Sequence, residues 1–259
     1  MDLSIIIVNY KSRAKLLSCL NSIKRSDLSG LKYEVIIVEN NSGDDLSDLT
    51  GEYRVIFSDQ NLGMGGGNNL GIKNSTGDFI LISNPDIIYE RDTIKKLFNY
   101  FSCHQEIGLI GPKLLNPDGS LQYSCVRFPK FYIPLLRRTS IGRFFPKSLN
   151  CYLMKASSHE EIMAVDWLLG ACFMVRRLEL VAGQLFDERY FMYFEDVDLG
   201  RQINRRGQLV VYYPLAKVIH DHLRQSANLP WYQSLFQDKI AREHLKSALR
   251  YFSKWRKIK

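Results

Sequence analysis

Short apolar runs alternate with amphipathic segments along the first hundred residues of the chain. The apolar runs predict four buried strands, at residues 3–8, 33–38, 55–57 and 79–83. After Ser12, a suitable N-cap residue, apolar side chains recur at helical spacing as far as Ile23. Strands that alternate with helices in this way predict an α/β fold built on a doubly wound sheet.

Polar residues follow each of the four predicted strands. They are Asn9 and Tyr10 after the first strand, then residues 39–42, 59–61 and 84–86 after the next three. Ligands in open α/β sheets bind outside the carboxyl ends of the strands. Four polar strand ends therefore predict one polar ligand-binding crevice along a single edge of the sheet.

A glycine-rich segment, Gly63 to Gly71, follows the third strand, and we predict a loop that opens a helix near Gly67. A dinucleotide-binding fingerprint would follow the first strand instead, with an acidic residue about 20 positions later. A Rossmann oxidoreductase is therefore the weaker alternative. Such a loop brings backbone N–H groups and a helix N-terminus to a phosphate or a sugar.

The regular pattern ends after Gly111, and residues 127–164 form a basic and aromatic stretch. Long irregular connections inside compact proteins are usually functional or disordered. We interpret this one as a mobile segment that faces the acceptor or a membrane, with an ordinary surface loop as the alternative. Order returns at residues 165–175, and further strands are predicted at 209–213 and 218–220.

An aromatic run from Phe186 to Phe194 leads into Glu195, Asp196 and Asp198 at the start of a predicted helix. Carboxyl groups are rarely buried unpaired, and burial, like charges or a helix N-terminus shift their pKa values. These carboxyl groups are the first candidates for a general base or a metal ligand. A capped amphipathic helix is the structural alternative.

Asn84, Pro85 and Asp86 end the fourth predicted strand. A carboxylate at this edge suits a hard divalent cation that also binds a diphosphate. His220, on a strand that leads into a polar turn, is a possible second ligand as a neutral imidazole. The alternatives are a turn that needs Asn-Pro-Asp for its backbone and a buried core histidine.

Composition limits the class of protein. The 259 residues are 46% hydrophobic, enough for a substantial α/β core, and no stretch approaches the roughly 20 apolar residues of a membrane span. The N-terminus lacks the pattern of a signal peptide. Five scattered cysteines without Cys-x-x-Cys spacing argue against a disulfide framework or a zinc site. We therefore predict a cytoplasmic protein.

The formal net charge of +8 is concentrated in residues 239–259, which hold eight Lys or Arg and one Glu. On a helical wheel, one side carries Arg242, Lys246, Arg250 and Lys254, and another carries Leu245, Leu249, Phe252 and Trp255. This pattern favours a helix on an anionic membrane over a nucleic-acid site. A helix packed on its own domain, with a solvated basic face, is the alternative.

Seven segments in order resemble the inverting GT-A glycosyltransferases of family 2, particularly bacterial rhamnosyltransferases of O-antigen assembly that act on polyprenyl-diphosphate-linked sugars. They are residues 4–10, 39–42, 61–69, 83–86, 167–177, 186–198 and 218–220. The resemblance extends to about Phe252. It implies a GT-A sheet over residues 1–230, with a nucleotide-sugar-binding half (1–111) and an acceptor and catalytic half (112–230). Residues 231–259 would form a basic amphipathic tail.

The resemblance also implies roles for individual residues. Asp196 would be the base, beside Glu195, and Asp86 and His220 would hold Mg²⁺ or Mn²⁺ on the donor diphosphate. Trp167, Gly170 and Ala171 would shape the sugar and acceptor site. Donor contacts would come from Asn9, Tyr10, Glu39, Asn61, Gly65, Gly66, Asn69 and Asn84. Asn84 and Glu39 depart from the family pattern, in which Asp is usual at both positions.

The predicted function is transfer of a sugar with inversion, because one carboxylate acts as base and no second one acts as nucleophile. The resemblance implies L-rhamnose from dTDP-β-L-rhamnose and a lipid-linked saccharide acceptor, at the inner face of a bacterial plasma membrane. UDP-galactofuranose or UDP-N-acetylglucosamine is the alternative donor. From another class, a catalytically silent protein that binds nucleotide sugars or polyanions also fits Asn84 and the basic tail.

Overall fold

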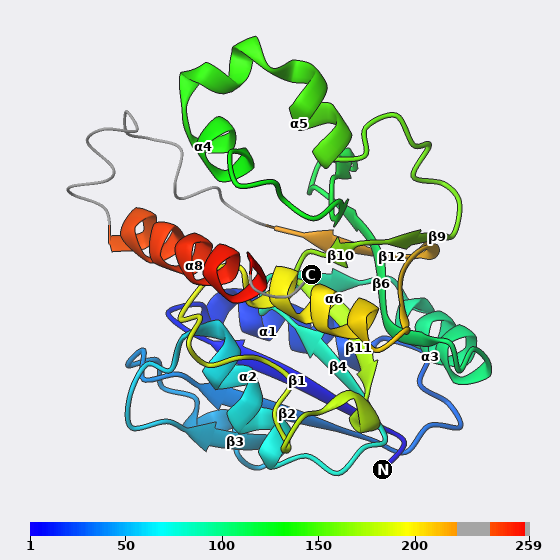
Figure 1. The fold of residues 1–259 in the computed structure, drawn as a ribbon. Coiled ribbons are helices and arrows are strands. Elements are labelled where there is room, and N and C mark those ends of the chain that lie inside the picture. Colours follow the sequence, from blue (N-terminus) through cyan, green and yellow to red (C-terminus); the bar gives the residue numbers. More distant parts are fainter. Residues whose placement is uncertain (222–238, 257–259) are drawn as a thin grey trace.

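The computed structural model describes residues 1–221 and 239–256, which build a ten-stranded mixed sheet with helices on both faces (Figure 1). The main path of the sheet is β3-β2-β1-β4-β11-β6-β12-β5. These strands are β1 (Leu3–Asn9), β2 (Tyr33–Glu39), β3 (Arg54–Phe57), β4 (Phe79–Ser83), β5 (Ile87–Tyr89), β6 (Ile107–Leu115), β11 (Cys172–Arg176) and β12 (Leu209–His220). The expected α/β fold on a doubly wound mixed sheet is confirmed.

The first four strands are parallel neighbours, as the alternating pattern predicts. Helices α1 (Arg13–Lys24) and α2 (Gly63–Lys73) connect them. Alternate residues of β1 enter different cores, since Ile5 and Ile7 belong to one apolar cluster and Ile6 to another. Because the strands run in one direction, their polar ends meet at one edge. The predicted polar edge is confirmed.

The second half of the sheet is mixed. β11 runs antiparallel to both β4 and β6, and β12 runs parallel to β6. The two strands predicted at 209–213 and 218–220 are one strand, β12, whose register shifts between Tyr213 and Lys217. Pro214 explains the misreading, because proline lacks the N–H that continues a ladder.

Residues 127–164 contain short helices, so the expectation of an irregular connection is wrong for this segment. It holds α4 (Ile133–Arg138), the 3₁₀ turn η2 (Ser140–Phe144) and α5 (Pro146–Tyr152), followed by β9 (Met163–Val165). Elements this short do not fill the window in which helical periodicity becomes visible. β8 (Cys125–Val126) and β10 (Trp167–Leu168) form a small separate sheet, and β7 (Leu121–Gln122) pairs with β6.

The predicted glycine-rich loop is also wrong, because residues 63–73 are helical from the first glycine onward. A Cβ atom on Gly67 would lie 2.9 Å from Val8 Cγ1, and one on Gly71 would overlap Ile6 Cγ2. Glycine at these positions therefore allows α2 to approach β1 closely. The need for close packing explains the composition, and the reduced helix propensity of glycine is the cost.

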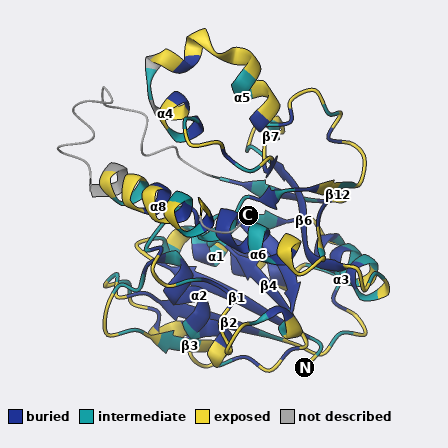
Figure 2. Cartoon of the chain, viewed as in Figure 1, coloured by how far each residue is buried: buried dark blue, intermediate teal, exposed yellow. Residues whose placement is uncertain are grey.

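The described residues form three further helices: α3 (Thr93–Cys103), α6 (Glu195–Arg205) and α8 (Lys239–Arg256). α8 lies beside α6 (Figure 1) and buries Ala248, Tyr251 and Trp255 in a cluster with Val197 of α6. Its outward face is exposed in Figure 2. The predicted division between the domain and a tail from residue 231 stays a prediction, but α8 shares a core with the domain.

Candidate active site

Two segments meet at the polar edge of the sheet. β4 pairs with β11 in antiparallel register, with Ser83 opposite Cys172, so the residues after β4 adjoin those before β11. The N–H of Asn84 donates to the carbonyl of Ala171 at 2.8 Å. Residues 84–86, predicted to include a metal ligand, therefore lie beside residues 167–171, predicted to shape the sugar and acceptor site.

Asp196 reaches this junction from the N-terminus of α6. Its Oδ2 accepts a hydrogen bond from the Gly170 N–H at 3.0 Å, and its Oδ1 accepts one from the Val197 N–H at 2.8 Å. A Cβ atom at residue 170 would lie 3.3 Å from the Cβ of Asp196. Glycine at residue 170 thus lets the carboxylate approach the backbone, and the two N–H groups hold it in one orientation.

The pKa values of Asp196 and its neighbour Glu195 are both raised. Burial is the largest cause for each, and the charge of Asp196 raises the pKa of Glu195 further. The N–H groups of Gly170 and Val197, and the guanidinium of Arg137, lower the pKa of Asp196 without cancelling the effect of burial. A carboxylate with a raised pKa is a stronger base than an ordinary aspartate, which suits proton removal from a hydroxyl.

The backbone before α6 is strained. Tyr193 and Phe194 have φ angles of 66° and 68°, in the left-handed region that non-glycine residues rarely adopt. Such residues cost on the order of 1–3 kcal/mol each and persist only where surrounding contacts enforce them. The ring of Phe194 packs against Tyr251 of α8, with centroids 5.3 Å apart, and Ser247 Oγ donates to the carbonyl of Met192 at 2.9 Å. α8 therefore supports the turn that aims Glu195 and Asp196.

Asp86 and His220 form the second charged pair of the edge. His220 Nε2 lies 3.3 Å from Asp86 Oδ1, and His220 Nδ1 lies 2.6 Å from Gln122 Oε1. Burial alone would raise the pKa of Asp86, but His220 and the ammonium of Lys15 lower it overall. Asp86 is therefore ionised at neutral pH, as a ligand of a hard cation must be.

These residues fit a cation that a diphosphate also binds. Within residues 1–221 and 239–256, no cluster of three or more Cys, His, Asp or Glu could hold a metal ion by itself. Asp86 and His220 present two ligand atoms, and phosphate oxygens would complete the shell. The buried Oδ1 of Asn84 accepts no hydrogen bond from any described residue, so it is available to a ligand of this edge.

The donor-side predictions have mixed surroundings. Asn9 is fully buried and donates to Asp44 Oδ2 at 2.8 Å, while its Oδ1 accepts nothing from the described residues. Asp44 Oδ2 also accepts the N–H groups of Ser12 and Arg13, so Asp44 caps α1 where the Ser12 side chain does not. Tyr10 is 44% exposed at the same edge.

Glu39 and Asn61 stabilise turns at this edge. Glu39 is buried, and its Oε1 accepts hydrogen bonds from the N–H and the hydroxyl of Ser42. Asn61 Oδ1 accepts one from the Gly63 N–H at 2.9 Å and one from Asn40 Nδ2 at 3.2 Å. Donor contact by these two residues stays a prediction.

Gly65, Gly66 and Asn69 lie within α2 and not in a phosphate-binding loop. Asn69 Oδ1 accepts the N–H groups of Leu185 and Phe186 at 3.1 and 3.0 Å, and Asn69 Nδ2 donates to Phe186 at 2.8 Å. Asn69 therefore fastens α2 to the segment that leads to the turn before Glu195 and Asp196.

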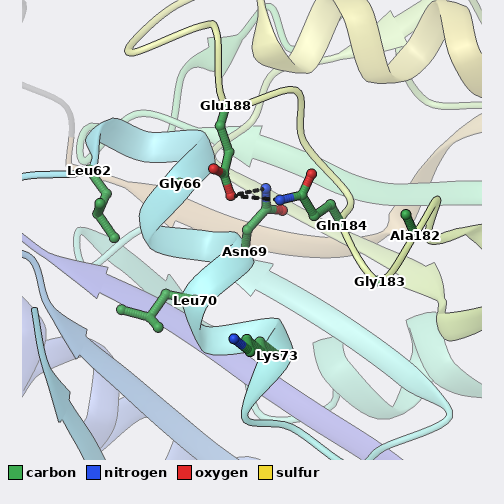
Figure 3. A pocket seen from close by; sticks show the side chains of 9 residues that line it. All are labelled: Leu62, Gly66, Asn69, Leu70, Lys73, Ala182, Gly183, Gln184 and Glu188. Atoms are coloured by element: carbon green, nitrogen blue, oxygen red, sulfur yellow. Dashed lines mark hydrogen bonds between the residues drawn. The ribbon is translucent and has the colours of Figure 1, made fainter.

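A cavity lies between α2 and residues 182–188, and Figure 3 shows its lining. Asn69 and Gln184 both donate to Glu188 there, at 3.1 Å each. The lining residues are Leu62, Gly66, Asn69, Leu70, Lys73, Ala182, Gly183, Gln184 and Glu188. Because Asp86, Asp196 and His220 are absent from this lining, the cavity is separate from the candidate active site.

Trp167 is buried, and its indole N–H donates to the Arg127 carbonyl at 2.8 Å. A Cβ atom on Gly200 would lie 2.5 Å from Trp167 Cβ, so α6 packs directly on this residue. The structure thus gives Trp167 a supporting position behind α6. Its predicted contact with the acceptor stays a prediction.

Sequence reasoning missed four residues of the site: Lys15, Gln122, Arg137 and Tyr152. Lys15 and Gln122 act through Asp86 and His220, as described above. Arg137 Cζ lies 5.7 Å from the Tyr152 ring centroid, and burial raises the pKa of Tyr152 to about 12. The basic and aromatic composition of residues 127–164 was a signal, but it indicated no single residue.

Comparison with known proteins identifies the family. The family model "Glycosyl transferase family 2" matches residues 4–162, which is more than half of the chain. The chain belongs to glycosyl transferase family 2.

Several relatives are rhamnosyltransferases. An N-acetylglucosaminyl-diphospho-decaprenol L-rhamnosyltransferase of Mycobacterium tuberculosis is 34% identical over 158 residues, covering 59% of this chain and 50% of its own. The rhamnosyltransferase WbbL of Escherichia coli is 26% identical and covers 97% of this chain and 93% of its own. The chain thus spans half the length of the mycobacterial relative but nearly all of WbbL.

Solved structures share the fold. GalNAc-T7 with UDP, GalNAc and Mn²⁺ gives a TM-score of 0.65 at 14% identity, covering 87% of this chain and 45% of that one. Staphylococcus aureus TarS with UDP gives 0.57 at 17% identity, covering 98% and 72%. Among the helices of residues 1–221 and 239–256, none combines the length and the apolarity needed to cross a membrane.

Proposed function

We propose that this glycosyltransferase moves L-rhamnose from dTDP-β-L-rhamnose, with inversion, to a polyprenyl-diphosphate-linked saccharide in the assembly of O-antigen or a similar surface polysaccharide. The observation that carries the proposal is the position of Asp196 beside Gly170, next to the Ala171–Asn84 contact that leads to Asp86. This edge brings a base toward a diphosphate site. The rhamnosyltransferase relatives supply the choice of sugar.

The proposed reaction is a single displacement. Asp196 accepts the proton of an acceptor hydroxyl, the hydroxyl oxygen bonds to C1 of the sugar, and the bond from C1 to the diphosphate oxygen breaks. The electron pair leaves with the nucleotide diphosphate, so the anomeric configuration inverts. The N–H groups of Gly170 and Val197 hold Asp196 in one orientation, and Glu195 lies next to it in the chain.

We propose Mg²⁺ or Mn²⁺ as the cofactor, held by Asp86 and His220. A divalent ion stabilises the charge that develops on the departing diphosphate. Two neighbours of this fold were solved with Mn²⁺, GalNAc-T7 and a mannosyltransferase of Pyrobaculum calidifontis. Asn84 replaces one carboxylate of the usual family pattern, so we expect weaker cation binding in the absence of nucleotide.

The proposed setting is the inner face of a bacterial plasma membrane, with the protein in the cytoplasm and no nucleic-acid partner. The outward face of α8 supports it, because Leu245 and Leu249 are exposed there beside Arg242, Lys246 and Arg250. Apolar and basic residues on one helical face are typical of contact with an anionic lipid surface.

A thermal-shift screen tests the choice of donor. The protein is heated with dTDP, UDP, GDP or CDP, each with and without Mn²⁺, because ligand binding to the native state raises its stability. We expect a selective shift with dTDP that requires Mn²⁺ and is lost in Asp86→Asn. A selective shift with UDP would instead favour UDP-galactofuranose or UDP-N-acetylglucosamine, and no shift with any nucleotide would contradict the proposal.

A further inference from the structure

We call residues 130–152 the arch. They form α4, η2 and α5 and project from the side of the sheet that lies opposite to β3 (Figure 1). Its outer surface is unusually apolar. Five large hydrophobic side chains are exposed on it, at fractions between 43% and 81%: Phe131, Leu135, Ile141, Phe144 and Phe145. Scattered single residues of this kind are ordinary, but a cluster of exposed aromatic and aliphatic residues marks an interaction surface.

The charged residues of the arch and of the sequence that flanks it are all basic. Residues 119–159 contain no Asp or Glu, and their seven basic residues are Arg127, Lys130, Arg137, Arg138, Arg143, Lys147 and Lys155. Arg143 immediately precedes the exposed Phe144 and Phe145, and exposed Lys147 follows them closely. Figure 2 shows exposed residues along η2 and α5. Alternating basic and apolar side chains match the boundary between anionic headgroups and acyl chains.

The inner side of the arch belongs to the enzyme core. Ile133 and Tyr152 are buried in the cluster that contains Trp167, Phe194 and Val197. The arch is therefore held against α6, and its outer residues are not needed to fill the core.

The arch also reaches the reaction centre. The Arg137 guanidinium packs near the Tyr152 ring, and its charge acts on Asp196. One short element thus carries exposed apolar side chains together with a cation whose charge acts on the candidate base. That arrangement suits an acceptor whose lipid lies in a membrane while its sugar and diphosphate enter the protein.

We infer that the arch docks on an anionic lipid surface, with Phe131, Phe144 and Phe145 in the interface, and delivers the lipid-linked acceptor to Asp196 past Arg137. The delivery step rests on the proposed function, whereas docking on lipid does not. A single-stranded nucleic acid would also meet basic and aromatic residues. The exposed aliphatic Leu135 and Ile141 favour lipid, since they cannot stack on bases.

Vesicle co-sedimentation of the full chain tests docking. The vesicles are phosphatidylcholine alone, or phosphatidylcholine mixed with phosphatidylglycerol. The variants are Phe144→Ser/Phe145→Ser and Arg143→Glu/Lys147→Glu. We expect binding to the anionic vesicles only, and a fall of at least about tenfold in the partition coefficient for each variant. Two aromatic rings buried in the interface contribute that much or more. The Glu substitutions replace attraction of two cations to anionic lipid by repulsion.

Matched controls separate the arch from general surface hydrophobicity and from α8. Leu178→Ser/Leu215→Ser removes two residues that are 72% and 55% exposed elsewhere, and Leu245→Ser/Leu249→Ser alters the outward face of α8. The Leu178 and Leu215 control should bind as the wild type does. Unchanged vesicle binding of both arch variants would overturn the inference, whatever the α8 variant does. So would binding to single-stranded DNA that the arch variants lose while they keep vesicle binding.

Activity on two acceptors tests delivery. With a short-chain, water-soluble acceptor analogue, the arch variants should retain transfer, because their altered residues lie outside the candidate site. With the long-chain acceptor in vesicles, they should lose it in proportion to binding. Equal loss on both acceptors would overturn the delivery step. A missing dTDP shift with intact vesicle docking would instead contradict the proposed donor and leave docking in place.

Discussion

At the residue scale, the site depends on carboxylates whose neighbours set their basicity. Asp196 has a raised pKa through burial, while Asp86 has a lowered pKa through His220 and Lys15. Environments that move two carboxyl groups in opposite directions separate a base from a cation ligand. The sequence pattern identified both residues as candidates, but their protonation depends on side chains from other segments.

Asp196→Asn should lower kcat by roughly 10² to 10⁴-fold, the usual contribution of a general base. The amide keeps the shape of the carboxylate but cannot accept the proton. The thermal shift with dTDP and Mn²⁺ should be unchanged, since Asp196 is not a proposed donor ligand. Transfer at the wild-type rate by this variant would remove Asp196 from the role of base.

The pH profile should show the raised pKa directly. The base must be ionised, so kcat/KM should rise with pH through a pKa above that of an ordinary aspartate, about 3.9. Arg137→Ala should move this acidic limb to higher pH, because the guanidinium lowers the pKa of Asp196. An acidic limb at the ordinary value in both proteins would contradict the assignment.

The free energy of unfolding should fall as pH rises, whereas kcat/KM should rise. The folded pKa values of Glu195 and Asp196 lie above their unfolded values, so the pair favours folding in acid, and this contribution is lost as pH rises through the raised pKa values. Glu195→Gln should therefore raise the melting temperature at alkaline pH relative to the wild type and have little effect in acid. A calorimetric series across pH measures both.

At the element scale, close packing decides what the glycine-rich segment does. Sequence reasoning predicted a phosphate loop there, whereas the structure shows a helix whose glycines face Val8 and Ile6. The same glycine-rich sequence suits a phosphate-binding loop or a closely packed helix. Contacts between residues some 60 positions apart in the chain decide between the two. Asn69 also depends on distant contacts, because its side chain accepts the N–H groups of residues 185 and 186 and does not lie in a phosphate-binding loop.

Gly71→Ala should destabilise the fold by about 1–3 kcal/mol, the usual cost of overpacking, because the added methyl group would overlap Ile6. Gly51→Ala is the matched control, since nothing lies within 4 Å of a Cβ atom there. Urea unfolding compares the two variants. Equal stability of Gly71→Ala and Gly51→Ala would show that α2 does not need this close approach.

At the scale of the whole molecule, the largest difference from the sequence prediction is the face of α8 that packs against the domain. Sequence reasoning placed Leu245, Leu249, Phe252 and Trp255 on one apolar face, but the docked face carries Ala248, Tyr251 and Trp255, while Leu245 and Leu249 are exposed. The fully buried Asp198 of α6 accepts hydrogen bonds from Lys254 and Trp255, at 2.7 Å each. One face of α8 packs on the domain, as the structural alternative predicted. The other face exposes Leu245 and Leu249 and is available for the predicted contact with a membrane.

Deletion of residues 239–259 should lower stability and activity as well as membrane binding, because it exposes the cluster around Phe194 and leaves the Asp198 carboxylate without two donors. Leu245→Ser/Leu249→Ser should lower partitioning onto anionic vesicles and preserve the melting temperature. Scanning calorimetry and vesicle sedimentation of the three proteins measure both effects. A deletion variant with the wild-type melting temperature would contradict the role of α8 in the core.

The sequence by itself determined the strands of the first half, the polar ends at one edge and the carboxylates at the start of α6. These features are encoded over a few neighbouring residues, through apolar periodicity and strand-end polarity. Only the tertiary structure decided that the glycines pack α2, that Trp167 supports α6, that α8 braces Tyr193 and Phe194, and that Arg137 acts on Asp196. Each of these depends on segments far apart in the chain, whose contact no local pattern records.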